Sequence, residues 1–187
     1  MLPIIPFAHS LLEETVQPGD QVIDATCGNG NDTYLLSTLV EETGIVYACD
    51  IQEQAIATTK EMMQKHQRHN VSYILDSHSK LTAHLPESAE RNIAAVIFNL
   101  GYLPKSDKTI ITQPDTTSRA INELLPYLKK QGRLILVIYH GHEGGSAEKS
   151  AVLKLAQELD QKYYQVLRYQ FINQQNTPPF IVAIERK

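Results

Sequence analysis

Residues 21–33 read Q-V-I-D-A-T-C-G-N-G-N-D-T, and this stretch decides the fold. A short apolar run ends in Asp24, a tight loop contains Gly28 and Gly30, and a helix is expected to begin near Asp32. A strand, a glycine turn and a helix start in this order indicate the entrance to a nucleotide-type pocket in a βαβ unit. Glycine suits the turn because it tolerates positive φ and lets a ligand approach the backbone.

A second apolar strand candidate, I-V-Y-A-C-D at residues 45–50, ends in Asp50, which is placed to accept hydrogen bonds from ribose hydroxyls. A dinucleotide fingerprint would carry its third glycine where this chain has Thr33, and a carboxylate at Asp32 would repel a pyrophosphate. The same carboxylate suits a ligand with a cationic end, such as S-adenosylmethionine. The alternative for Asp32 is a plain helix N-cap. We therefore favour a methyltransferase-type loop over a dinucleotide-type loop.

The rest of the chain alternates between apolar strand-like segments and helix-like segments. Further strands are expected at residues 71–75, 93–98, 132–139, 164–172 and 180–185, the last two as an antiparallel hairpin. Helices are expected at residues 8–16, 32–40, 52–69, from 116 or 117 to 128, and 146–159. This alternation predicts an α/β fold with a mostly parallel sheet and helices on both faces, in a single domain that spans residues 1–187.

Length and composition bound the class of protein. The 187 residues are 42% hydrophobic and 20% charged, which suits one domain with a substantial core. We expect neither a membrane span nor a secretory signal, because no run of about 18 apolar residues occurs and the first residues lack a basic region. The two cysteines, Cys27 and Cys49, are expected to be reduced thiols, which favours a cytoplasmic protein.

Charge is unevenly distributed along the chain, although the net charge is only −4. Residues 1–59 hold nine acids and no Lys or Arg, so the remainder holds 12 acids with all 17 bases, a balance of +5. A cationic cofactor would dock near the acidic part, and an anionic partner would meet the other part. The alternative is chance segregation of solvated surface charge.

Polar residues gather at the carboxyl ends of the expected strands, where ligands bind in parallel sheets. They are Asp24, Asp50, Asp76, Asn99, Tyr139 and His142. Asp76 is placed either to accept from an adenine amino group or to form an Asx turn. The residues expected to bind the cofactor are Asp24, Thr26, Cys27, Gly28, Asn29, Gly30, Asn31, Asp32, Asp50, Ile51, Gln52, Asp76, Ser77, His78 and Asn99.

Three stretches carry a family resemblance: D-A-T-C-G-N-G-N-D-T from Asp24, N-L-G-Y-L-P from Asn99 and G-H-E-G-G from Gly141. They resemble the family long labelled putative rRNA methylase, and the resemblance covers nearly the whole chain. It implies a Rossmann-like class I methyltransferase fold, with seven strands and the last one antiparallel, and S-adenosylmethionine as the cofactor. Characterised members are tRNA methyltransferases that convert 5-aminomethyl-2-thiouridine at the wobble position, 34, into the 5-methylaminomethyl form.

The segment Asn99-Leu100-Gly101-Tyr102 is similar to the N-P-P-Y signature of amino-methylating enzymes. The similarity implies that Asn99 accepts hydrogen bonds from a substrate amine and that Tyr102 packs on the substrate. Orienting the amine is most of the catalytic task, because sulfonium is already a good leaving group. Leu-Gly in place of Pro-Pro makes the loop less rigid, and a strand-end turn is the alternative. His142 is the third catalytic candidate, as a proton acceptor or a base-holding group, or else it is merely exposed.

The expected partner is the anticodon arm of tRNA, with the target base flipped or in a loop so that it reaches the methyl group. Candidate substrate or RNA contacts are Lys105, Lys108, Arg119, Tyr139 and His140, with Arg133, Lys149 and Lys154 as the next place to look. Ordinary solubility charges are the alternative. A homodimer is expected, with Leu100, Leu103 or the terminal hairpin at the contact. No metal is expected, since H-G-H alone lacks the further ligands of a zinc site.

Two other functions stay open from the sequence. One is methylation of a different acceptor, such as rRNA or a small amine. The other is a non-catalytic nucleotide-binding or RNA-binding module with the same fold. The nucleoside composition of tRNA from cells that lack the protein separates all three.

Overall fold

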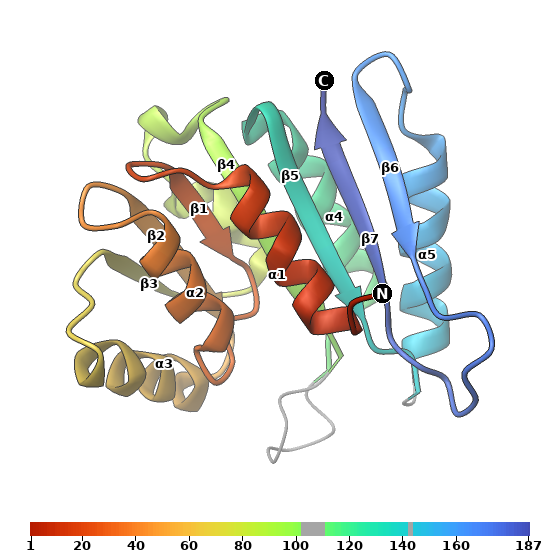
Figure 1. Cartoon of the computed structure of the whole chain (residues 1–187), viewed down its shortest axis with the longest axis horizontal. Coiled ribbons are helices and arrows are strands. Elements are labelled where there is room, and N and C mark those ends of the chain that lie inside the picture. Colours follow the sequence, from red (N-terminus) through yellow and green to blue (C-terminus); the bar gives the residue numbers. More distant parts are fainter. Residues whose placement is uncertain (102–110, 142–143) are drawn as a thin grey trace.

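The computed structural model describes residues 1–101, 111–141 and 144–187. Its centre is a seven-stranded sheet with the strand order β3-β2-β1-β4-β5-β7-β6 (Figure 1). The strands are β1 (Gln21–Asp24), β2 (Ile45–Asp50), β3 (Val71–Leu75), β4 (Ile93–Leu100), β5 (Leu128–Ile138), β6 (Tyr164–Tyr169) and β7 (Phe180–Arg186). Strands β1 to β5 pair in parallel, whereas β7 is antiparallel to both β5 and β6. The expected mostly parallel sheet with a terminal antiparallel hairpin is confirmed.

Helices cover both faces of the sheet. Three pack on one face: α1 (Ile4–Thr15), α2 (Asn31–Leu39) and α3 (Glu53–Lys65). The other face carries α4 (Pro114–Leu124), α5 (Gly145–Glu158) and the short turns η1 (His78–His84), η2 (Glu87–Ala89) and η3 (Leu125–Tyr127). In Figure 1, α1 crosses in front of the sheet while α4 lies behind it.

Strand β4 explains why the core has two halves. Its side chains alternate, so that Val96 and Phe98 pack toward α4 and α5, while Ala95 and Ile97 pack toward α1 and α2. All four side chains are buried. A strand covered on both faces requires an uninterrupted apolar run, which is the pattern that this segment shows in the sequence.

Several element boundaries differ from the sequence prediction. Helix α1 begins at Ile4 instead of residue 8, because Pro3 precedes the helix and Pro6 lies in its first turn, where a missing N–H costs nothing. Helix α4 ends at Leu124 instead of residue 128, because the residues around Pro126 form only the short turn η3. Strand β5 accordingly begins at residue 128, four residues earlier than expected.

Helix α3 is also shorter than expected, ending at Lys65 instead of residue 69. Two residues beyond it, Gln67 has φ of 53°, a left-handed conformation that cannot continue the helix. Within the described ranges, no helix is long and apolar enough to cross a lipid bilayer.

The order of the strands fixes where a ligand binds. The chain passes from β1 outward to β2 and β3, and then returns to pair β4 on the other side of β1. Open α/β sheets bind ligands outside the carboxyl ends of the strands at such a switch point. The site is therefore expected beyond Asp24 at the end of β1 and Asn99 near the end of β4.

Candidate active site

A cavity of about 1390 Å³ opens at the carboxyl ends of the parallel strands. Its walls come from the β1–α2 loop, the ends of β2 and β4, the start of η1, helices α1 and α2, and the connection between β6 and β7. The cavity thus lies at the switch point between β1 and β4, where the fold places a ligand site.

The β1–α2 loop is tied to the carboxylate of Asp50. The backbone N–H of Gly28 donates to Oδ2 of Asp50 at 3.1 Å, and the N–H of Gln52 donates to Oδ1 at 3.0 Å. Burial raises the pKa of Asp50, and the backbone N–H groups oppose that rise. A carboxylate has about four acceptor positions, so Asp50 retains acceptor capacity for a ligand hydroxyl.

The two glycines of this loop have different tasks. Gly28 has φ of 49° and lines the cavity, where its bare backbone lets a ligand approach. Gly30 has φ of 82° and is buried against α3, so that an added Cβ would lie 3.1 Å from Cα of Thr59. Gly30 therefore serves the packing of α3 and the start of α2, and it does not line the cavity.

Asp24 supports the loop from below. It is fully buried and accepts a 2.6 Å hydrogen bond from Oγ1 of Thr33 and a 3.3 Å hydrogen bond from the N–H of Thr26. Burial raises the pKa of Asp24, and the nearby charge of Asp32 raises it further. Asp24 was predicted to contact the cofactor directly. It does not line the cavity, and its hydrogen bonds instead hold the loop in place.

Asp32, in the first turn of α2, joins two side chains from distant parts of the chain. Nε2 of His9 lies 2.7 Å from Oδ1 of Asp32, and Nδ2 of Asn99 donates to Oδ2 at 2.6 Å. The hydrogen bond to Asp32 raises the pKa of His9, while partial burial opposes the rise. His9, Asp32 and Asn99 all line the cavity, so α1, α2 and β4 together build one polar wall.

A buried imidazole, His78, stands on another wall of the cavity. Its side chain is 8% exposed, and its ring lies edge-on to Phe98 with centroids 5.6 Å apart. Burial lowers the pKa of His78 to about 4, so the ring is neutral at pH 7. In the described part of the chain its Nε2 has no hydrogen-bond partner, which leaves a polar atom for a ligand.

Most of the residues predicted to bind the cofactor or the substrate meet at this cavity. They are Thr26, Cys27, Gly28, Asn29, Asn31, Asp32, Asp50, Ile51, Gln52, Ser77, His78, Asn99, Tyr139 and His140. The predicted residues Tyr102, Leu103, Lys105, Lys108 and His142 lie outside the described residues.

Two predicted contacts are engaged elsewhere. The carboxylate of Asp76 accepts from the N–H of Ser77 at 2.7 Å and lies 3.1 Å from Nε2 of His84 and 3.3 Å from Nζ of Lys80. Arg119 pairs with Glu123 through a 2.7 Å contact. Neither Asp76 nor Arg119 lines the cavity.

The sequence prediction missed the contribution of two segments. His9 comes from a helix that its apolar spacing marks only as scaffold. Asn176 and Thr177, in the polar turn of the hairpin, also line the cavity. The one sequence signal for the role of His9 was its position in the first helix, close to the apolar residues Leu11 and Leu12.

A buried carboxylate, Glu148 in the first turn of α5, anchors the segment that follows β4. Its Oε2 accepts from Oγ1 of Thr112 and its Oε1 accepts from Oγ1 of Thr117, each at 2.7 Å. Oγ1 of Thr112 in turn accepts from the N–H of Gly101 at 3.0 Å. Glu148 therefore links the residue just after β4 to the start of α4, and it holds the rim of the cavity in shape.

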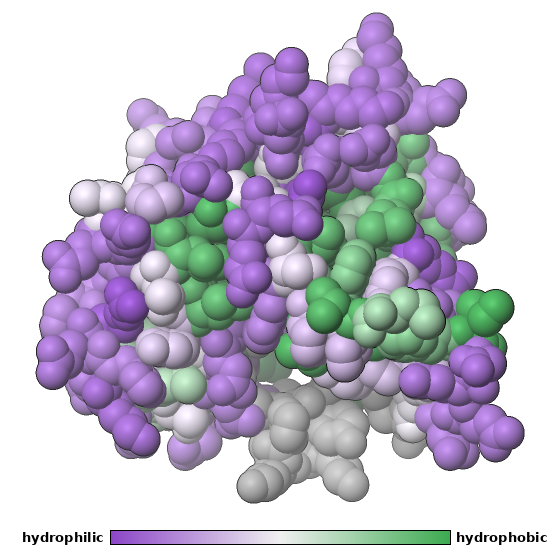
Figure 2. Space-filling model, in the orientation of Figure 1, coloured by the Kyte–Doolittle hydropathy of each residue, from purple (hydrophilic) through white to green (hydrophobic). Residues whose placement is uncertain are grey.

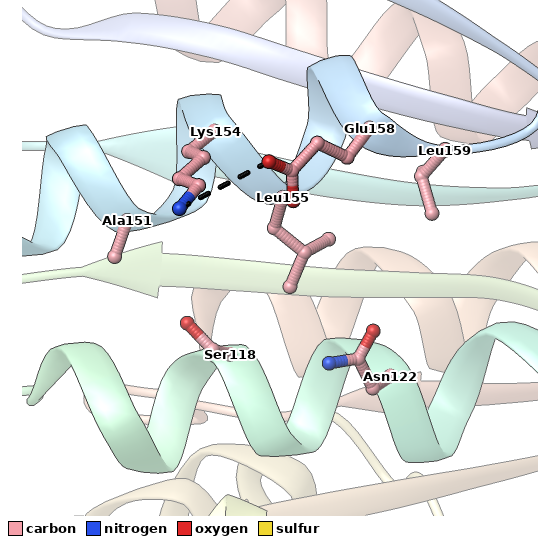
Figure 3. A pocket seen from close by; sticks show the side chains of 7 residues that line it. All are labelled: Ser118, Asn122, Ala151, Lys154, Leu155, Glu158 and Leu159. Carbon is pink, nitrogen blue, oxygen red and sulfur yellow. Dashed lines mark ion pairs between the residues drawn. The ribbon is translucent and has the colours of Figure 1, made fainter.

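A second, smaller cavity of about 440 Å³ lies between α4 and α5 (Figure 3). Ser118 and Asn122 face Ala151 and Leu155 across it, and Lys154 reaches toward Glu158 at 4.0 Å. None of the residues predicted to bind the cofactor lines this cavity, but Lys154, which the sequence offered as a further RNA contact, does. It is a groove between two surface helices, separate from the polar wall described above.

Comparisons with known proteins agree with this geometry. A family model described as "Putative rRNA methylase" matches residues 46–185. A tRNA (mnm(5)s(2)U34)-methyltransferase of Arabidopsis thaliana chloroplasts is 36% identical over 189 residues, which cover 96% of this chain and 68% of that protein.

Solved structures show the same relationship. A "putative rRNA-methylase" from Clostridium thermocellum has a TM-score of 0.95 and 39% identity, with 100% of both chains covered. A "putative methyltransferase" from Streptococcus mutans, crystallised with SAH, has a TM-score of 0.91 and 43% identity, with 100% of this chain and 99% of that chain covered. From the match over most of its length and from these relatives, the chain belongs to the putative rRNA methylase family of S-adenosylmethionine-dependent methyltransferases.

Proposed function

We propose that this protein methylates the primary amine of 5-aminomethyl-2-thiouridine at the wobble position of tRNA, giving the 5-methylaminomethyl form. The observation that carries the proposal is the hydrogen bond from Nδ2 of Asn99 to Asp32 at the cavity wall. The name of the Arabidopsis relative, which is a tRNA (mnm(5)s(2)U34)-methyltransferase, supports the same acceptor.

The residues of the cavity fit S-adenosylmethionine. Asp50 has acceptor capacity left for a ribose hydroxyl, and Ile51 beside it is 53% exposed, an apolar side chain suited to the face of a base. The orphaned Nε2 of His78 offers a polar contact nearby, and Asp32 supplies negative charge for a cationic end. When bound, this cofactor supplies a methyl group on a sulfonium, which leaves as a neutral thioether.

The contact with Asp32 fixes which end of the Asn99 amide is available. An ionised carboxylate can only accept hydrogen bonds, so Asn99 must present its NH₂ group to Asp32. The carbonyl oxygen Oδ1 of Asn99 is then directed away from Asp32 and remains an acceptor. An amine that donates one N–H to this oxygen has its lone pair held in a defined direction.

Holding the amine in this way is the main catalytic task of the protein. Good orientation of reacting groups is worth up to roughly 7–11 kcal/mol of a barrier. Transfer would form the new N–C bond from the nitrogen lone pair as the C–S bond breaks, giving a neutral thioether and a secondary ammonium that can then release one proton. Only the neutral amine has a free lone pair, so the substrate ammonium must lose its proton before the transfer.

The proposal is tested by the nucleoside composition of tRNA from cells that lack the gene. Mass spectrometry is expected to show that 5-aminomethyl-2-thiouridine accumulates and that the 5-methylaminomethyl form is absent. The wild-type gene is expected to reverse both changes. An unchanged wobble-uridine profile, or a lost methyl group in rRNA instead, would remove the proposal.

We also propose that the protein is a homodimer joined through the terminal hairpin. Strand β6 is the edge of the sheet, and its Val166 and Leu167 are 43% and 46% exposed. Figure 2 shows hydrophobic side chains on the right-hand part of the molecule as it is viewed there, over the region of α1, β7 and β6. Leu100, expected as a possible contact, is fully buried and is excluded from that role.

An edge strand with exposed apolar residues pairs readily with a second copy. Light scattering is expected to give twice the 21.0 kDa mass of one chain. A wild-type protein that remains at the mass of one chain at micromolar concentration would rule the dimer out. If the wild type is dimeric, Leu167→Glu is expected to shift it toward the monomer.

A further inference from the structure

Two cations meet on one aromatic ring beside the mouth of the cavity. Nζ of Lys149, in α5, lies 5.9 Å from the ring centroid of Phe180, and Cζ of Arg168, in β6, lies 4.7 Å from the same centroid. Phe180 is fully buried at the start of β7, so the ring holds both cations near that end of the hairpin. Cation–π contacts of this kind position a charge without neutralising it.

The pair is adjacent to the proposed catalytic cavity. The ring of His140, which lines the cavity, lies 5.7 Å from the ring of Phe180 between centroids. The pKa of His140 is lowered first by burial and then by the positive charges of Lys149 and Arg168, which places both cations within electrostatic reach of the cavity wall. The Nε2 atom of His140 is buried and has no hydrogen-bond partner among the described residues.

Neither cation has a carboxylate partner among the residues that the structure describes. Other cations proposed from the sequence do: Arg119 pairs with Glu123, Arg133 with Glu14 and Glu185, and Lys154 with Glu158. Lys149 and Arg168 belong to no such pair, although two positive charges near one ring repel each other. An anion placed between them would remove that repulsion.

We propose that Lys149 and Arg168 form a phosphate-binding subsite for the RNA backbone next to the nucleotide that enters the cavity. The proposal rests on the proposed function, because it takes the substrate to be RNA. Arginine and lysine supply the sequence-independent part of RNA affinity through phosphate contacts. A backbone phosphate held at this rim, with His140 between the cations and the cavity, would leave the attached base free to point toward Asn99.

Equilibrium binding of RNA tests the subsite without any turnover. The probe is a synthetic anticodon stem-loop RNA, and its affinity for the full-length protein is measured by fluorescence anisotropy over a salt series in the presence of S-adenosylhomocysteine. The double variant Lys149→Ala/Arg168→Ala is compared with Lys154→Ala/Lys162→Ala. The control removes the same charge, one residue from the same helix and one from the turn just before β6. Its Lys162 lies over Tyr163, next to the end of β6 that is remote from Phe180.

For the Lys149/Arg168 variant, we expect roughly tenfold weaker binding at physiological salt and a salt slope smaller by about 1.4–1.8, the value for two lost phosphate contacts. The control variant is expected to bind within twofold of the wild type, and both variants are expected to keep the wild-type affinity for S-adenosylhomocysteine. Equal salt slopes for the two double variants would overturn the subsite.

The same experiment separates the failure of the subsite from the failure of the proposed function. If the wild type methylates tRNA but the two variants bind RNA alike, the subsite is wrong and the function stands. If the wild type shows no salt-dependent affinity for the stem-loop RNA and transfers no methyl group to tRNA, the proposed function and the subsite both fail.

Discussion

Nε2 of His9 and Oδ1 of Asp32 lie 2.7 Å apart, although 23 positions separate the two residues in the chain. This contact joins the first helix to the helix that follows the glycine loop. Asp32 uses its other oxygen to hold the amide of Asn99. We therefore propose that His9 is a positioning residue, which restricts the rotation of the Asp32 carboxylate and through it orients Asn99.

Replacing His9 with Ala is expected to lower kcat for tRNA methylation about tenfold, because a carboxylate with one partner removed orients Asn99 less well. A lost hydrogen bond to a charged group is worth about 1.5–3 kcal/mol. The affinity for S-adenosylmethionine, measured by calorimetry, is expected to change less than twofold. His9→Gln, which can still donate to Asp32, should recover part of the lost rate. No recovery by Gln would assign His9 a role other than positioning.

The same contact makes a prediction for pH. The hydrogen bond to Asp32 raises the pKa of His9 above its usual value of 6.5. The protonated ring therefore stabilises the folded state fully below pH 6.5, and this contribution is lost as the pH rises through the raised pKa. The difference in free energy of unfolding between wild type and His9→Ala, on the order of 1 kcal/mol at pH 6, is expected to shrink by pH 8. A difference that grows with pH would contradict the charged contact.

The lowered pKa of His78 predicts the opposite dependence at lower pH, where stability falls as the pH falls. Burial lowers its pKa to about 4 in the folded protein, whereas the unfolded chain has the ordinary value of 6.5. As the pH falls below 6.5, protons bind the unfolded state first, so stability is lost down to about pH 4. Urea unfolding should show a loss smaller by roughly 1–3 kcal/mol in His78→Gln, which has no such titration. Parallel pH profiles for the two proteins would refute the buried neutral ring.

Asp50 offers a direct test of the cofactor site. Asp50→Ala is expected to weaken the binding of S-adenosylmethionine by roughly 1–3 kcal/mol, the scale for polar groups left without a partner. Calorimetry on the folded variant measures the change, with Asp76→Ala as the control because Asp76 does not line the cavity. If the two variants bind equally well, Asp50 does not hold the ribose. Tight binding of NADH by the wild type would refute the choice of cofactor.

Glu148 predicts an effect on stability. Glu148→Ala removes the acceptor of the hydroxyls of Thr112, which is partly buried, and of Thr117, which is fully buried. The variant is expected to lose about 1–3 kcal/mol of unfolding free energy in urea, while Glu148→Gln, which keeps an acceptor oxygen, should lose less. Equal losses for Ala and Gln would show that the size of the side chain matters here and not its oxygens.

Much of the fold could be predicted from the sequence, because strand periodicity and turn residues are local signals. The strands at residues 45–50 and 71–75 agree with β2 and β3 at both ends. Two of the boundary errors fell at prolines, Pro6 in the first turn of α1 and Pro126 between α4 and β5. Another fell at the end of α3, where Gln67 is left-handed. A proline within a first helical turn and a proline that ends a helix look alike in sequence.

The candidate site was predictable where it follows from strand ends. Asp50 ends β2 and Asn99 lies near the end of β4, the two strands that flank β1, and the structure brings both residues to one cavity. The contact between His9 and Asp32 was not predictable, because it depends on how α1 crosses the sheet. Gly30 was predicted as a cofactor contact, but the structure places it against Thr59 and away from the cavity lining.

The most direct test of the central claim is methyl transfer by the purified protein. tRNA from cells that lack the protein is incubated with the protein and S-adenosylmethionine, and its nucleosides are then analysed by mass spectrometry. The account predicts that 5-aminomethyl-2-thiouridine is converted into the 5-methylaminomethyl form by the wild type. It also predicts that Asn99→Ala transfers at least a hundredfold more slowly while still binding the cofactor. If the wild type leaves this nucleoside unchanged, or Asn99→Ala converts it at the wild-type rate, the account is contradicted.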